Sequence, residues 1–227
     1  NPIGNIMIDH CSCSWGLDEN ISFYRHMYDP GEGYNKEKLP TVNVTIQNTI
    51  SSQALDTYNH AFGSTLGGEN CAFVRNLWAS NAGRNPSVGW FGIFNFVNNV
   101  VYNWVHRSVD GGDYRAMFNM VNNYYKPGPA TPSGTHYFFN QSLQRDGATS
   151  LGPSKWHFSG NIMEGDDAVT ADNWKGFKNS TSYSIDDIKV DTIIQTSGDH
   201  DHQKYHYDWD TYTYKNYETA AEAYESV

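Results

Sequence analysis

One arginine stands apart from the other charged residues of the chain. Arg84 lies in the stretch "ASNAGRNPSVGWF" (79–91), which holds no other charged side chain and places Arg84 between an Asn-Ala-Gly turn signal and a proline. A guanidinium holds its proton tightly and binds carboxylates well. With no acidic residue close in sequence, Arg84 has no local partner for an ion pair, and the sequence around it leaves open what its charge binds. The simpler interpretation is a turn cap or a fixed cation.

Acidic and histidine side chains supply further candidates. Asp18 and Glu19 are adjacent carboxylates; Asp18 fits a loop carboxylate, and Glu19 should point away from it as its neighbour in a strand. Histidine titrates near neutrality, so His10 and His60 could each act as a general base. His60 is interpreted as a turn or supporting residue that could face a ligand, while His10 fits a structural position in a repeat described below. The acidic and histidine-rich run at 199–202 favours a solvated loop over a metal site, because neighbouring residues of an extended chain alternate direction.

Cysteine usage does not indicate a disulfide framework. The chain has 3 cysteines, and two of them, Cys11 and Cys13, are expected on the same side of one strand, which is a poor geometry for a disulfide. We interpret all three as small buried side chains. A pair between Cys71 and Cys11 or Cys13 stays open.

Composition restricts the class of protein. The chain has 227 residues, 38% hydrophobic residues and a formal net charge of −10, which argues against nucleic acid as a partner because phosphate binding needs a basic surface. No apolar run approaches the roughly 20 residues of a membrane span. The chain opens without Met, directly into the strand-like "NIMIDH", so we expect a processed or truncated, soluble protein.

An internal repeat predicts the architecture. The segments "VTIQN", "AFVRN", "NFVNN" and "NMVNN" end at Asn48, Asn76, Asn99 and Asn123, at steps of 28, 23 and 24 residues, and "IMIDH" places His10 in the same position. Units of about two dozen residues that lack helical periodicity are typical of a parallel β-helix. The asparagines are then expected to form a buried hydrogen-bonded ladder at a turn rather than a catalytic group.

The rest of the chain is expected to follow less regularly. We predict one domain over 1–227, with regular coils over about 5–131 and a loop-rich part over 132–227. The segment "WHFSGNIMEG" adds one more strand, "YDPGEGYNKEKLP" (28–40) forms a long loop, and "TAAEAYESV" forms a C-terminal helix over an end or side of the solenoid.

Five motifs in order resemble one family. They are "IDHCSCSWGLDENIS" (8–22), "HAFGSTLGG" (60–68), "RNLWASNAGRNP" (75–86), "FVNNVVYNW" and "VNNYYKPGPAT", and together they resemble polysaccharide lyase family 1, the pectate lyases, in the branch with Ser-Trp-Gly before the Asp. The resemblance implies an all-β, right-handed parallel β-helix that cleaves polygalacturonate by β-elimination. In this family calcium bridges acidic side chains and the anionic sugar, which gives a role to the negative net charge.

The resemblance also implies roles for individual residues. Arg84 falls on the family's catalytic arginine, which acts as the base at C5 of a galacturonate. Asp18 falls on the first acidic residue of the Asp-x-x-x-Asp calcium motif, whereas the second position is Ser22, and the other calcium ligands lie upstream of residue 1 in the family. The resemblance therefore implies a chain that lacks its N-terminal coils.

Two substrate-binding cations of the family are missing. Phe62 stands at the position of its lysine, and the stretch 87–90 lacks its second arginine. Aromatic side chains could bind a sugar ring instead, although such residues are often core residues; these are Phe62, Trp90 and Phe91. Replacement cations are Arg75, Arg107 and Arg115, and Arg75 is expected to point away from the side that Asn76 faces. The substrate-binding candidates are His60, Trp90 and Arg75.

These features predict a secreted, extracellular or periplasmic lyase. The expected partner is an acidic polysaccharide, the expected cofactor is Ca²⁺, and the expected state is a monomer without nucleic-acid or membrane partners. Two alternatives stay open. A lyase for methyl-esterified pectin would tolerate the missing cations and the incomplete calcium motif, and a non-catalytic β-helix could bind acidic polysaccharide without cleaving it.

Overall fold

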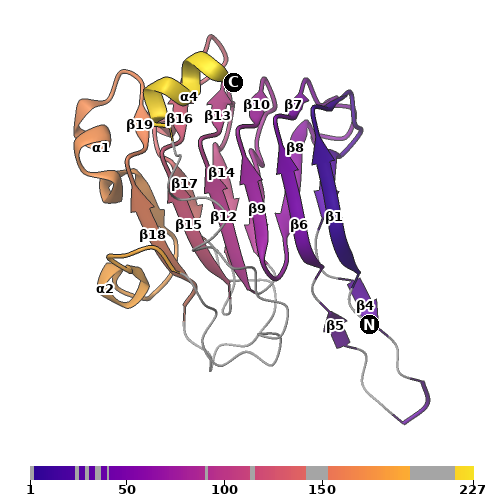
Figure 1. The fold of residues 1–227 in the computed structure, drawn as a ribbon. Coiled ribbons are helices and arrows are strands. Elements are labelled where there is room, and N and C mark those ends of the chain that lie inside the picture. Colours follow the sequence, from indigo (N-terminus) through magenta and orange to yellow (C-terminus); the bar gives the residue numbers. More distant parts are fainter. Residues whose placement is uncertain are drawn as a thin grey trace.

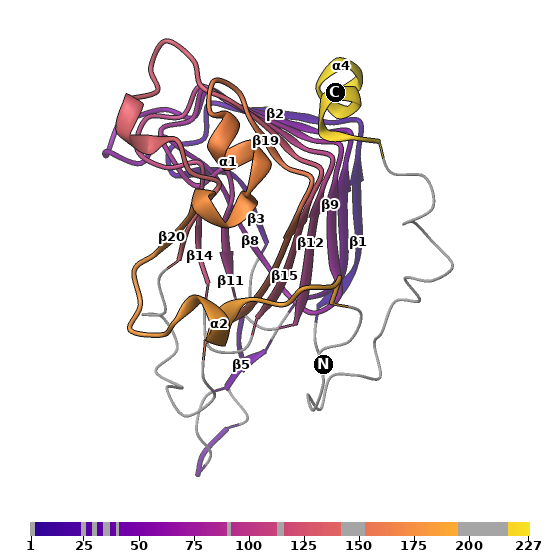
Figure 2. The same ribbon diagram turned by 90° about the vertical axis from the view of Figure 1, so that its left-hand side faces the viewer.

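The computed structural model describes residues 3–23, 26–28, 31–33, 37–39, 41–89, 92–112, 116–141, 153–194 and 218–227. Three parallel sheets of six strands form the three sides of a solenoid, as Figure 2 shows in a view along its length. Sheet A contains β1 (Gly4–Asp9), β6 (Val42–Gln47), β9 (Cys71–Val74), β12 (Ile93–Val97), β15 (Met117–Val121) and β18 (Lys155–Ser159). Sheet B contains β2 (Ser12–Ser14), β7 (Ile50–Ser52), β10 (Leu77–Ala79), β13 (Val100–Tyr102), β16 (Tyr124–Lys126) and β19 (Ile162–Met163). Sheet C contains β3 (Glu19–Phe23), β8 (Phe62–Gly67), β11 (Ser87–Gly89), β14 (Val109–Gly111), β17 (Phe139–Gln141) and β20 (Phe177–Asn179).

The order of these strands makes a parallel β-helix. The chain passes from sheet A to B to C and then starts the next coil, so coil 1 is β1, β2 and β3 and coil 6 is β18, β19 and β20. Figure 1 shows the coils side by side, from coil 1 at the right to coil 6 at the left. The predicted all-β, right-handed parallel β-helix is confirmed.

Alternating side chains explain why these segments form stacked strands. In β6 the sequence "VNVTIQ" buries every second residue, and Val44 and Ile46 are fully buried in the interior. Period-two burial is typical of a strand with one face on the core. Large aromatic side chains fill the later coils: the ring centroid of Phe118 lies 5.6 Å from that of Phe94 and 3.8 Å from that of Trp156.

The asparagine ladder lies at the corner between sheets A and B. Asn76, Asn99 and Asn123 are buried, and their side chains form hydrogen bonds with the neighbouring coils. For example, the side-chain oxygen of Asn99 accepts from the backbone N–H of Asn76 at 2.9 Å, and Asn99 Nδ2 donates to the carbonyl of Phe73 at 2.8 Å. The ladder continues beyond the predicted frame to Asn161 and Asn173.

Two residues were placed wrongly in that ladder. Strand pairing aligns Gln47 with Val74, so Asn48 is level with Arg75, one residue before the ladder position. Thr49 takes the ladder position and donates its backbone N–H to Asn76 Oδ1 at 3.0 Å. Asn48 instead occupies a corner position with φ of 47°, like Arg75, Asn98 and Asn122. The same position holds His10, which has φ of 51° and a side chain 76% exposed, so it is not a buried ladder residue. Asparagine tolerates this left-handed conformation better than most residues.

Helices and additional strands decorate the solenoid. The segment "WHFSGNIMEG" supplies β18 and β19, as predicted, and sheet C continues to β20, well past residue 131. The C-terminal helix is confirmed as α4 (Ala220–Ser226). Among the described residues, four further helices were not predicted: the α-helices α1 (Asp167–Ala171) and α2 (Ile185–Ile188), and the 3-10 helices η1 (Ser133–Thr135) and η3 (Asn173–Gly176). At the predicted loop 28–40, β5 (Glu37–Leu39) lies within the loop and forms an antiparallel pair with β4 (His26–Tyr28), which ends where the loop begins. No helix in the described part of the chain is long and apolar enough to cross a membrane.

The three cysteines are all free thiols but not all buried. Cys71 is fully buried, as predicted, while Cys13 is half-buried and Cys11 is exposed. The prediction was wrong for Cys11 because this residue precedes β2 instead of facing the interior from it.

Candidate active site

Arg84 lies at the corner where the chain passes from sheet B to sheet C. The corner joins β10 to β11, and the backbone of Arg84 has φ of 53°. Its carbonyl accepts the backbone N–H of Ser64 in the preceding coil at 2.8 Å. Two fully buried asparagines brace the turn: Asn81 Nδ2 donates to Asn85 Oδ1 at 3.1 Å and to the carbonyl of Ser51 at 3.0 Å. The corner is therefore held by hydrogen bonds on both sides of Arg84.

Two carboxylates from coil 1 pair with this guanidinium. Arg84 Nη1 donates to Glu19 Oε1 and lies 3.7 Å from Asp18 Oδ1. The side chains of Arg84 and Glu19 are 20% and 13% exposed, so the pair is largely sheltered from water, whereas Asp18 is 56% exposed. The expectation that Arg84 is isolated from acidic partners was wrong, because the stacking of coils supplies acids that are distant in sequence.

Glu19 is further fixed by neutral hydroxyl groups. Thr65 Oγ1 donates to Glu19 Oε1 at 2.7 Å, and Ser22 Oγ donates to Glu19 Oε2 at 3.3 Å. The prediction that Glu19 points away from Asp18 was wrong, because Asp18 precedes β3 and strand alternation begins only at Glu19. Ser22, expected as a poor calcium ligand, orients Glu19 instead.

The ring of Phe62 lies beneath the arginine. Phe62 is 7% exposed, and the Cζ atom of Arg84 lies 4.1 Å from its ring centroid, which is a cation–π distance. A second guanidinium, that of Arg107, lies 5.8 Å from the same centroid. Phe62 was considered as a face for a sugar ring, but it is buried and its ring supports Arg84.

Arg107 is the replacement cation that the fold brings to this corner. Its Nε pairs with the carboxylate of Asp110, which is 9% exposed, on β14. Asp110 lies beside Ser87 in the strand register of sheet C. Together with Asp18, Glu19 and Arg84, this pair gives the corner three carboxylates and two guanidiniums, a formal net charge of −1.

His60 completes the exposed side of the cluster. Its Nδ1 lies 4.0 Å from Asp18 Oδ1, its side chain is 46% exposed, and its ring centroid lies 5.0 Å from that of Phe62. Since His60 and Asp18 are the most exposed members of this group, a ligand would approach Arg84 from their side.

The cluster takes residues from four successive coils. Glu19 comes from coil 1 with Asp18, Phe62 from coil 2 with His60, Arg84 from coil 3, and Arg107 from coil 4 with Asp110. Adjacent parallel strands lie about 4.8 Å apart, so residues far apart in sequence come into contact along the solenoid axis. Sequence spacing alone did not indicate this arrangement for Glu19.

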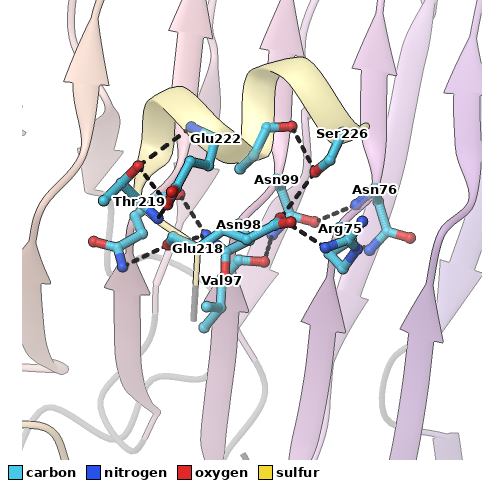
Figure 3. A network of polar contacts seen from close by, with 11 residues as sticks. Arg75, Asn76, Val97, Asn98, Asn99, Glu218, Thr219, Glu222 and Ser226 are labelled. Atoms are coloured by element: carbon cyan, nitrogen blue, oxygen red, sulfur yellow. Dashed lines mark hydrogen bonds and ion pairs between the residues drawn. The ribbon is translucent and has the colours of Figure 1, made fainter. Parts of the chain in front are cut away.

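Arg75, in contrast, is not part of this cluster. It lies between β9 and β10, at the other end of sheet B, and its Nη1 pairs with Glu218 Oε2 at 2.6 Å. The side-chain amides of Asn98 and Asn122 donate to the carbonyl of Glu218 at 2.6 Å and 2.9 Å, so the three corner residues hold the start of α4 (Figure 3). Arg75 does point away from buried Asn76, as expected.

Several predicted residues lie outside the described part of the chain. These are the substrate-binding candidate Trp90, its neighbour Phe91, the possible cation Arg115 and the acidic and histidine-rich run 199–202. Among the residues that the structure describes, no group of three or more His, Cys, Asp and Glu side chains could hold a metal ion.

The carboxylates at the corner do not fit a complete calcium site. Ca²⁺ takes six to eight oxygen ligands, but Glu19 is committed to Arg84, Thr65 and Ser22. Of the three carboxylates at this corner, Asp18 is the exposed one, and the neighbouring guanidinium would repel a cation there. These carboxylates thus do not make a calcium site.

Part of the chain is similar in sequence to known proteins. A protein of Aspergillus terreus named "Probable pectate lyase C" is 37% identical over 149 residues, which is 60% of this chain. The chain is similar to this protein over part of its length. Proteins of the same name from Aspergillus flavus and Emericella nidulans are 35% and 34% identical, each over 56% of the chain. The resemblance predicted from the five motifs is confirmed.

The similarity covers a limited part of these pectate lyases. The matched region is 30% of the Aspergillus terreus protein and 27% and 26% of the other two. No family model matches the chain.

Proposed function

We propose that this protein is a polysaccharide lyase that cleaves a polygalacturonate-type chain by β-elimination, with Arg84 as the group that acts on the sugar. The observation that supports it best is the position of Arg84: a braced corner of the solenoid, a ring beneath it, and an exposed approach beside Asp18 and His60. Relatives named pectate lyase support the reaction class.

The proposed reaction removes the proton at C5 of a uronate residue, alpha to its carboxyl group. The electron pair of the C5–H bond forms the C4–C5 double bond, and the C4–O glycosidic bond breaks with its electrons on oxygen, which takes a proton from water. Arg84 must be uncharged to accept the C5 proton, and it then gives this proton to the hydroxide left by that water, so the net change moves one proton from C5 to the C4 oxygen. Because Arg84 contacts Glu19 through Nη1, its second Nη nitrogen is the group proposed to meet the substrate.

In this proposal, calcium would bind only together with the substrate, with Asp18 as its ligand from the protein. When bound, the ion would neutralise a substrate carboxylate and so favour the enolate-like intermediate. Because the three carboxylates at this corner do not make a calcium site, the steps above do not depend on the ion. We propose that the protein acts outside the cell as a monomer on an acidic polysaccharide.

A second candidate function is cleavage of methyl-esterified pectin. The formal charge of −1 at the corner favours it, because a neutral ester is not repelled by Asp18, Glu19 and Asp110. Binding of acidic polysaccharide without cleavage is the third outcome that the experiments distinguish.

The first test replaces the arginine. Arg84→Lys and Arg84→Ala are expected to reduce turnover by at least about 100-fold, measured as formation of the unsaturated product. Arg84→Lys should lower the melting temperature less than Arg84→Ala, because it keeps a cation beside the sheltered carboxylate of Glu19. Unchanged turnover in both variants would remove Arg84 from the mechanism.

The second test compares substrates. Unsaturated product is measured on polygalacturonate and on esterified pectin, with and without a chelator. Chelator-sensitive cleavage of polygalacturonate supports the pectate reaction, and chelator-resistant cleavage of pectin supports the second candidate. Binding of either polymer without any product would exclude both lyase functions.

A further inference from the structure

The carboxylate of Glu19 occupies the partner position of the arginine that the proposed reaction needs. A free uronate carboxylate is the natural ligand for a guanidinium, yet Glu19 Oε1 already accepts from Arg84 Nη1. Thr65 and Ser22 hold Glu19 in this position through its two carboxylate oxygens. An acidic sugar must therefore either displace Glu19 or bind beside a second negative charge.

Other charges at the corner do not offset this effect. Arg107 is paired with Asp110, and Asp18 adds a negative charge 3.7 Å from Arg84 on the exposed side. Glu19 is only 13% exposed, so water and salt screen it less than they screen a surface carboxylate. A methyl-esterified uronate carries no charge and meets neither repulsion nor competition.

We propose that Glu19 is a specificity-determining residue, which makes the Arg84 site favour esterified over free uronate units unless a cation is added. This inference rests on the proposed function, because it assumes that a uronate chain binds beside Arg84. It assigns the choice between the two candidate substrates to one side chain. Asp18, farther from Arg84 and more exposed, contributes in the same direction but less.

The test removes the charge and keeps the shape. Glu19→Gln retains an oxygen that can accept from Arg84 and Thr65. The matched control is Glu225→Gln on the exposed surface of α4, at the opposite corner of sheet B, which changes net charge by the same amount. Binding of a short oligogalacturonate and of its methyl ester is measured by calorimetry with a chelator present.

The parent protein and Glu225→Gln are expected to bind the ester more tightly than the free acid. Glu19→Gln should reduce this preference by about ten-fold, and Asp18→Asn should reduce it by a smaller factor. In Glu19→Gln, the kcat/KM on pectin divided by that on polygalacturonate should also fall.

Three results would overturn the inference: a parent protein without preference for the ester, a Glu19→Gln variant that behaves like Glu225→Gln, or binding of neither oligomer. If Glu19→Gln fails to fold, Asp18→Asn still decides, since no shift there contradicts the charge effect. A shift in binding preference without any unsaturated product would reject the lyase function alone and leave the role of Glu19 intact.

Discussion

At the scale of single residues, the orientation of Arg84 depends on contacts from three sides. Glu19 binds its Nη1, Asp18 lies at 3.7 Å, and the ring of Phe62 lies beneath it. An arginine side chain has many rotamers, and fixing it in one costs conformational entropy. The contacts in the folded protein offset this cost before a substrate arrives.

Phe62 is therefore expected to matter for both stability and activity. Phe62→Leu keeps an apolar side chain but removes the ring, which should lower the free energy of unfolding by about 1–2 kcal/mol and turnover by about ten-fold. Denaturant unfolding and product formation measure the two effects.

Phe62→Tyr keeps the ring and serves as the control. If Phe62→Leu loses stability but turns over at the parent rate, the ring has a packing role only and does not orient Arg84.

At the scale of elements, the asparagine ladder joins one coil to the next. Asn99 is fully buried and links coils 3, 4 and 5 through Asn76, Asn123 and the carbonyl of Phe73. A buried polar group that loses its partner bears the full desolvation cost. The ladder thus contributes to stability mainly because every member needs its neighbours.

Asn99→Ala should lower the free energy of unfolding by about 2–4 kcal/mol, because it leaves the backbone N–H of Asn76 and the carbonyl of Phe73 without their partner. Denaturant titration followed by fluorescence measures this. The control is Asn140→Ala on the outer face of β17, whose side chain bonds to exposed Ser180, and a change within about 0.5 kcal/mol is expected there. Equal effects at both positions would contradict the role of the ladder.

The C-terminal helix is an element with a separable attachment. Glu218 pairs with Arg75, and Tyr224 stacks on Tyr124 with ring centroids 4.5 Å apart while its hydroxyl accepts from Lys126 Nζ at 2.6 Å. Figure 1 shows α4 lying along one edge of the solenoid, close to β16 and β13. The helix is thus fixed at a corner that does not hold Arg84.

Glu218→Gln should increase hydrogen exchange of the backbone amides of α4 and leave kcat/KM unchanged, because the ion pair lies at the other end of sheet B from Arg84. Mass spectrometry of the C-terminal peptide measures the exchange. A loss of activity comparable to that of Arg84→Lys would show that this corner does influence the reaction.

At the scale of the whole molecule, a cysteine thiol and two tyrosine hydroxyl groups make the free energy of unfolding depend on pH in the alkaline range. Burial raises the pKa of Cys71 to about 12, and burial together with the hydrogen bond to Glu164 raises the pKa of Tyr124 to about 12. Burial also raises the pKa of Tyr125. In each case the neutral form is favoured in the folded state, so the unfolded chain releases its proton at a lower pH.

The free energy of unfolding should therefore fall as pH rises above about 9, where the unfolded thiol ionises and the folded Cys71 does not. The slope is at most about 1.4 kcal/mol per pH unit for one such group. Urea unfolding between pH 8 and 11 measures it. Cys71→Ala should show a shallower fall between pH 9 and 11, and an unchanged slope would assign the effect to other groups.

The fold was largely predictable because its signals are local and repeated. Short β-branched runs that end at an asparagine predicted the stacked strands, and Asn76, Asn99 and Asn123 were placed correctly. Asn48 was placed one residue out because the first repeat has a threonine, Thr49, in the ladder position, and threonine carries no repeat signal of its own.

The site was less predictable because its contacts cross coils. Arg84 was singled out from its isolation in sequence and from the motif around it, but Glu19 was assigned the wrong direction, and the contact between the buried ring of Phe62 and Arg84 was not predicted. The contacts of both residues with Arg84 depend on the register between coils 1, 2 and 3, and that register follows from strand pairing rather than from local spacing.

The axial arrangement of the site has a consequence for local unfolding. The residues around Arg84 come from coils 1 to 4, which pair strand by strand in sheet C. Local opening of any one of these coils would separate Arg84 from Glu19 or Phe62, or remove Arg107 from the corner. The geometry of the corner therefore lasts only while coils 1 to 4 stay stacked on one another.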